Sequence, residues 1–98
     1  MIGLLATPLA KPQKLAELRE RIDSIDLQIV SLLNQRADVV KQVGRLKRQA
    51  GMPVAAPQRE QEVFRNVMGQ AKSLPPEAVK RIYERIIGEM KAVEDTRH

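Results

Sequence analysis

The chain of 98 residues has the size of one domain and is too short for two ordinary hydrophobic cores. It has no cysteine, which excludes disulfides and thiolate chemistry, and its aromatic content of 2% leaves an aliphatic core that suits packed helices better than a β-sandwich. The formal net charge of +5 favours an anionic partner, which is either nucleic acid or a small polyanionic metabolite.

Residues 1–12 are mildly apolar, but no charged region precedes them and Pro8 interrupts them. This pattern is unlike a signal peptide or a membrane span. We therefore expect a flexible N-terminal arm over residues 1–12 and one helical domain over residues 13–98. We also expect no association with a membrane and a location in the cytoplasm.

A long helix is predicted from about Gln13 to about Gln49, because apolar residues recur there in steps of three and four. The stripe consists of Leu15, Leu18, Ile22, Ile25, Ile29, Leu32, Arg36, Val39, Val43 and Leu46. A second apolar row, Val30, Leu33 and Val40, widens this face. A helix about 50 Å long and apolar over so wide an arc needs more partners than one short chain supplies. The sequence therefore predicts an intertwined homodimer without a stable folded monomer.

Two shorter helices follow. Gly51 and Pro53 end the first helix, and Pro57 is well placed as the first residue of a second helix that reaches about Ala71. Pro75 and Pro76 open a third, whose apolar stripe is Val79, Ile82, Tyr83, Ile86, Ile87, Met90 and Val93. The predicted fold class is all-α, with three helices per chain.

One member of the first stripe is charged. Arg36 stands where an aliphatic residue is expected, with no carboxylate four residues before or after it. Its long side chain could reach solvent from the edge of the stripe, but a buried guanidinium without a carboxylate is costly unless an anion meets it. Lys47 lies eleven residues on, about three turns and ~16 Å along the same face, which suggests a cationic pocket. Arg19 lies about 25 Å away and turned by about 100°, so it can share this pocket only across a dimer interface.

Two carboxylates, Glu60 and Glu94, are further candidates for this pocket. Glu60 lies in the first turn of the second helix, where the helix dipole alone would also favour a glutamate. Glu94 continues the apolar stripe of the third helix, four residues after Met90. The sequence contains no Ser-His-Asp or Cys-His arrangement, no cluster of metal ligands and no phosphate-binding glycine motif. We therefore expect neither metal nor cofactor, and chemistry that works by positioning and electrostatics.

Three segments resemble the all-helical (AroQ-class) chorismate mutases of the shikimate pathway: LRERIDSIDLQIVSLLNQRADVVKQVGRLK, PVAAPQRE and RIYERIIGEMKAVE. The similarity covers about residues 14 to 95. It implies an intertwined homodimer of three-helix chains and an isomerase that converts chorismate to prephenate for phenylalanine and tyrosine biosynthesis, without cofactor or metal.

The resemblance also implies roles for individual residues. Arg36 would pair with one substrate carboxylate and Arg19 of the second chain with the other, while Arg59 would lie in or near the site. Glu60 would accept a hydrogen bond from the substrate hydroxyl. Lys47 would donate to the ether oxygen, which gains negative charge as its C–O bond breaks.

Three positions depart from the pattern. Some relatives have glutamine at the position of Glu94, and a glutamate can donate to the ether oxygen only when it is protonated. The resemblance thus predicts that activity falls with rising pH. Met90 stands where many relatives have a small polar residue, so only its backbone could contact a carboxylate. Ala56 replaces an acidic residue that helps to hold the hydroxyl in some relatives. Both changes suggest weaker substrate binding.

Alternatives remain open at this point. The isochorismate pyruvate-lyase branch shares the fold and the cationic pocket, but it lacks the glutamate matched by Glu60. The chain could also be the mutase domain of a larger bifunctional enzyme. A basic helical nucleic-acid-binding or adaptor module is less favoured, because Lys and Arg are spread along all three helices without a dedicated basic face.

Overall fold

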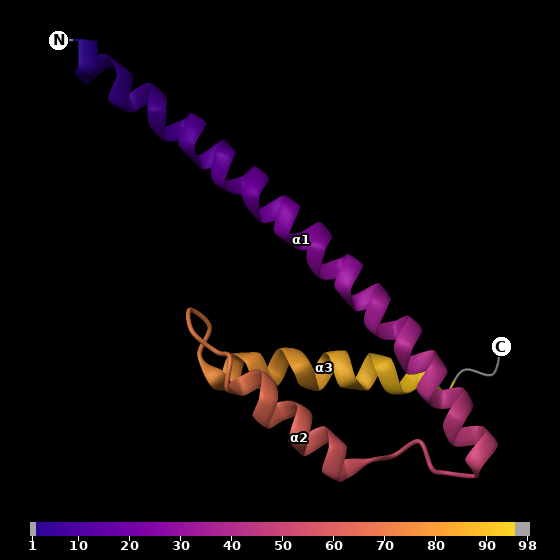
Figure 1. Cartoon of the computed structure of the whole chain (residues 1–98). Helices are drawn as coiled ribbons and strands as arrows, with labels where there is room; N and C mark the ends of the chain where they lie inside the picture. The colour runs from indigo at the N-terminus through magenta and orange to yellow at the C-terminus, as the bar shows by residue number, and fades with distance from the viewer. Residues whose placement is uncertain (1, 96–98) are drawn as a thin grey trace. The chain divides into compact units, whose positions relative to one another are not determined.

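The computed structural model describes residues 2–95, and it contains three α-helices and no β-strand in that range. The helices are α1 (Ile2–Ala50), α2 (Pro57–Met68) and α3 (Pro76–Glu94), as Figure 1 shows. This confirms the predicted all-α fold with a long first helix. Met1, the first residue of the predicted arm, and residues 96–98, the end of the predicted helical domain, lie outside the described residues.

The helix α1 starts at Ile2 and not near Gln13, so the predicted boundary was wrong. A proline inside a helix removes one hydrogen bond and crowds the preceding turn, which is why Pro8 suggested a break. The residues around it are mostly leucine and alanine, which are good helix formers, and the helical backbone continues through them. The flexibility of residues 1–12 stays a prediction.

The chain divides into two units, residues 1–35 and residues 36–98. The first unit is the N-terminal part of α1. Between residues 13 and 32 its large apolar side chains are exposed, from 39% for Leu18 to 73% for Leu27. Within the first unit, the described part of the predicted stripe is therefore open to solvent.

The second unit begins with the C-terminal part of α1, which ends at Gly51 in a Schellman motif. Gly51 has a φ of 66°, a left-handed conformation that glycine adopts without a steric penalty. Its N–H donates to the carbonyl of Arg48 at 3.3 Å, and the N–H of Met52 donates to the carbonyl of Lys47 at 2.8 Å. These bonds satisfy two of the last helical carbonyls and turn the chain into the loop before α2.

Helices α2 and α3 pack side by side in this unit (Figure 1). Pro57 and Pro76 are their first residues, as predicted, because a proline there loses no intrahelical bond. The helix α2 ends at Met68, short of the predicted Ala71, and the chain continues in tight turns such as the Ala71 N–H to Met68 carbonyl bond of 3.1 Å. Among the described residues, the buried hydrophobic core consists of Phe64, Ile87 and Met90.

Candidate active site

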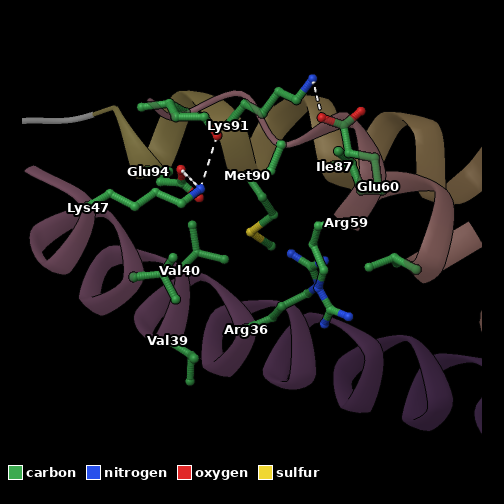
Figure 2. Close-up of a pocket in the computed structure, with 14 residues that line it drawn as sticks. Arg36, Val39, Val40, Lys47, Arg59, Glu60, Ile87, Met90, Lys91 and Glu94 are labelled. Atoms are coloured by element: carbon green, nitrogen blue, oxygen red, sulfur yellow. Dashed lines mark hydrogen bonds and ion pairs between the residues drawn. The ribbon is translucent and has the colours of Figure 1, made fainter. Parts of the chain in front are cut away.

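A cavity of about 460 Å³ lies within the second unit, between the last turns of α1, the following loop, α2 and α3 (Figure 2). Its charged lining residues are Arg36, Lys47, Arg59, Lys91, Glu60 and Glu94. Its uncharged lining residues are Val39, Val40, Val43, Val54, Ala56, Val63, Ile87 and Met90. Four cationic and two anionic side chains leave an excess of two positive charges over an apolar wall.

Lys47 is held in this cavity by two acceptors. Its Nζ atom donates to Oε2 of Glu94 at 2.9 Å and to the carbonyl oxygen of Val54 at 3.0 Å. The Lys47 side chain is only 17% exposed. Because an ammonium group has three N–H donors, this arrangement fixes Lys47 and leaves one donor for a further acceptor.

Glu94 is positioned through both its side chain and its backbone. The side chain, 12% exposed, pairs with Lys47, and the carbonyl oxygen of Glu94 accepts a hydrogen bond of 3.0 Å from Nη1 of Arg48. Gly44 allows this approach of α1 and α3, since a Cβ atom at Gly44 would lie 2.5 Å from the Glu94 carbonyl oxygen. The glycine is therefore required by the close contact between the two backbones.

A second ion pair lies on the wall of the cavity that α2 and α3 form. Nζ of Lys91 lies 2.7 Å from Oε2 of Glu60, and the two side chains are 48% and 26% exposed. Glu60 lies in the first turn of α2 and Lys91 in the last turn of α3. The pair thus joins the start of one helix to the end of the other (Figure 2).

The two arginines of the cavity differ in their partners. Arg36 is half-buried, and its guanidinium has no hydrogen bond or ion pair within residues 2–95. Arg59 pairs with Glu62 one turn further along α2, and both side chains of this pair are exposed. Both side chains point into the cavity (Figure 2). An unpaired, partly desolvated guanidinium favours an anionic ligand, as the sequence predicted for Arg36.

The structure brings six predicted site residues together around this cavity: Arg36, Lys47, Arg59, Glu60, Met90 and Glu94. Ala56 also lines it, as the residue before the first turn of α2. Met90 contributes a buried side chain, and because an N–H in a helix interior donates within the helix, contact through its backbone is unfavourable. Arg19 belongs to the first unit, where it is exposed.

The sequence did not predict four groups that hold the charged residues of the cavity in place: the carbonyl of Val54, Gly44, Arg48 and Lys91. A glycine in the interior of an otherwise strong helix is a signal of close backbone approach, and Gly44 could have been found in this way. The Val54 carbonyl and the Lys91 side chain carry no such signal, because their partners are fixed only by the packing of the second unit.

The described part of the chain has neither a cluster of metal ligands nor a helix that could span a membrane. No cluster of His, Cys, Asp or Glu side chains within it could hold a metal ion. None of the helices in this part is long and apolar enough to cross a membrane.

Comparison with known families gives one match along most of the chain. The profile of the family described as chorismate mutase type II matches residues 18–95. The matched region includes Arg19 and every residue that lines the cavity.

Individual relatives agree with this match. The chain is 40% identical over 80 residues to a bifunctional chorismate mutase/prephenate dehydratase of Aquifex aeolicus, covering 76% of this chain but only 22% of that protein. It is 29% identical over 90 residues to a 4-amino-4-deoxychorismate mutase of Streptomyces pristinaespiralis, covering 90% of this chain and 70% of that protein. Among solved structures, a chorismate mutase (form II) of Thermus thermophilus superposes with a TM-score of 0.83 at 25% identity, covering 86% of this chain and 97% of that one.

Proposed function

Because the chain belongs to the chorismate mutase type II family, we propose that it is an isomerase that rearranges chorismate to prephenate. In this pericyclic reaction one C–C bond forms while the ether C–O bond breaks, and no group of the protein is consumed. The protein's contribution is to hold the substrate in a reactive conformation and to stabilise the charge that develops on the ether oxygen. The product is the precursor of phenylalanine and tyrosine in the shikimate pathway.

The observation that carries the proposal is the charge of the cavity. Its four cationic side chains suit a dianion such as chorismate, and its apolar wall suits the carbon skeleton of the ring. A cavity of about 460 Å³ lies within the range of small-molecule sites.

Lys47 is the proposed donor to the ether oxygen. Two of its N–H groups donate to Glu94 and to the carbonyl of Val54, which fixes the conformation of the side chain. The third N–H group is then available to the substrate. A donor that is already fixed stabilises the developing charge without a cost of reorganisation during the reaction.

Glu94 is the second proposed donor to the same oxygen, and in this role it must be protonated. One of its carboxyl oxygens accepts a hydrogen bond from Nζ of Lys47 at 2.9 Å, so its side chain is already held in the cavity. This role therefore predicts that activity depends on pH.

Arg36 is proposed to bind one carboxylate of the substrate, and Arg19 of a second chain the other. A homodimer is supported by the exposed apolar side chains of the first unit, Leu15, Leu18, Ile22, Ile25, Leu27, Ile29, Val30 and Leu32. Apolar side chains that are exposed together along one helix mark protein interfaces. A dimer would cover them and would also supply Arg19 for the second carboxylate of the substrate.

The remaining lining residues have supporting roles. Glu60 is proposed to accept a hydrogen bond from the substrate hydroxyl, and Arg59 to add positive charge near a carboxylate. Met90 forms part of the apolar wall. Ala56 offers no polar group, so the hydroxyl would be held by Glu60 alone among the carboxylates of the cavity.

The family match and the named relatives favour a mutase over an isochorismate pyruvate-lyase. The similarity to the Streptomyces protein supports a second candidate substrate, 4-amino-4-deoxychorismate, which carries an amine where chorismate has its hydroxyl. We propose that the positive charge serves to bind chorismate or its amino analogue, and that nucleic acid is not a partner. A cytoplasmic location stays a prediction.

The test is an incubation of the purified chain with chorismate and, separately, with isochorismate, followed by identification of the products. Prephenate formed from chorismate is the expected result. Release of pyruvate from isochorismate as the main reaction would identify a lyase, and no turnover of chorismate would contradict the proposal.

A further inference from the structure

Glu60 is not a free carboxylate in the cavity. Its Oε2 atom lies 2.7 Å from Nζ of Lys91, and both residues line the cavity (Figure 2). Lys91 is 48% exposed, so water weakens the pair, but Glu60 at 26% exposure is screened less. The electrostatic field at Glu60 is therefore that of an ion pair and not of a lone negative charge.

The other oxygen of Glu60 remains available. Its Oε1 atom has no hydrogen-bond partner among the described residues, so it can accept a hydrogen bond from a ligand. The other cationic residues that line the cavity are Arg36, Lys47 and Arg59. A ligand group that approaches Glu60 thus meets one hydrogen-bond acceptor with the ammonium group of Lys91 beside it.

This environment treats a hydroxyl and an amine differently. A hydroxyl is neutral and needs only the acceptor, which a paired carboxylate still provides. An aliphatic amine is mostly protonated at neutral pH, so it gains from a lone carboxylate but is repelled by the nearby ammonium of Lys91. The difference between the two substrates then depends on the charge at position 91.

We propose that Lys91 is a specificity-determining residue, which selects a substrate with a hydroxyl over one with an amine at the position that Glu60 contacts. It acts through Glu60 and needs no contact with the substrate itself. The inference rests on the proposed function, because it assumes that chorismate or its amino analogue occupies the cavity. Specificity of this kind comes from a repulsive element against the wrong substrate as well as from attraction of the right one.

The test compares kcat/KM for chorismate with kcat/KM for 4-amino-4-deoxychorismate in the full chain. Lys91→Met and Lys91→Gln both remove the charge, and Lys91→Arg keeps it. We expect the ratio of the two values to fall by about fivefold in the uncharged variants, the size of a charge interaction between partly exposed groups. Lys91→Arg should stay close to the wild type.

Lys72→Met is the matched control, since it removes one exposed lysine outside the cavity and should leave the ratio unchanged. Circular dichroism checks that each variant is folded. An unchanged ratio in folded Lys91→Met and Lys91→Gln, with chorismate still converted, would overturn the role of Lys91 and leave the proposed function intact. Failure of the wild type to convert either substrate would overturn the proposed function and this inference with it.

Discussion

Lys47 and Glu94 form an ion pair of 2.9 Å that joins α1 to α3 inside the second unit. Both residues are proposed donors to the same substrate oxygen, yet in this structure one donates to the other. The contact therefore fixes the position of each proposed donor relative to the other.

The first prediction concerns the pH dependence of activity. A glutamate donates only when protonated, so the proposed role of Glu94 as a donor predicts that kcat/KM of the wild type falls as the pH rises. A glutamine donates at every pH, so Glu94→Gln should have a flatter profile between about pH 5 and about pH 9. Rates of prephenate formation over this range provide the measurement.

Glu89→Gln is a suitable control for this profile, because Glu89 pairs with Arg85 in an exposed contact outside the cavity. If Glu94→Gln keeps the slope of the wild type, Glu94 does not act as a neutral donor.

The second prediction concerns Arg36. Its guanidinium has no ion-pair partner within residues 2–95, so Arg36→Ala should not lower the free energy of unfolding. Loss of a charge-assisted contact to a substrate carboxylate should reduce kcat/KM by about a hundredfold or more. Arg45→Ala removes an exposed arginine of the same helix that does not line the cavity and should change little. Full activity of Arg36→Ala would remove this residue from the site.

The third prediction concerns Gly44. Alanine is the better helix former, but its Cβ atom at position 44 would meet the backbone oxygen of Glu94 at 2.5 Å. Gly44→Ala should therefore lower the free energy of unfolding by about 1–3 kcal/mol and also reduce activity, because the end of α3 must move away from Lys47.

Gly88→Ala is the matched control for this substitution. Gly88 lies in α3, and no neighbouring atom lies within 4 Å of the place that a Cβ atom would take, so alanine should raise the free energy of unfolding by about 0.5–1 kcal/mol. Thermal unfolding of both variants checks the opposite signs. Equal effects at the two positions would mean that the backbones of α1 and α3 are not in close contact.

The fourth prediction concerns Ala56, which precedes the first turn of α2 without a side-chain cap. Ala56→Asp adds an N-cap acceptor and should stabilise the protein by about 1 kcal/mol. Because Ala56 lines the cavity, the new carboxylate should also lower KM for chorismate. Ala55→Asp, in the exposed loop one residue earlier, should do neither. A gain in stability without a change in KM would limit position 56 to a structural role.

The fifth prediction concerns the dimer. If each site combines Arg36 of one chain with Arg19 of the other, Arg19→Ala and Arg36→Ala should each lose nearly all activity but should regain part of it when unfolded and refolded together. Random pairing makes half of the dimers mixed, each with one intact site of two, so we expect about a quarter of the wild-type activity. Activity that does not return on mixing would place both arginines in sites within one chain, or show that no dimer forms.

The sequence by itself determined the helices, the loop between α1 and α2 and the cationic character of the site. These features depend on local rules: a spacing of three and four residues, prolines at the first helical position and a glycine after the last turn. The same periodicity predicted correctly that Arg36 and Lys47 share one face, and both line the cavity. The start of α1 lies before the predicted Gln13, because the helix propensity of the leucines and alanines around Pro8 outweighs the effect of this proline.

Only the tertiary structure decided which charges neutralise each other. Lys47 with Glu94, and Glu60 with Lys91, are far apart in the chain, and no period in the sequence relates them. Their pairing follows from the packing of α2 and α3 against each other and from the contact that Gly44 permits. A sequence lists the ionisable groups, but packing fixes the distances between them, and the electrostatic energy depends on those distances.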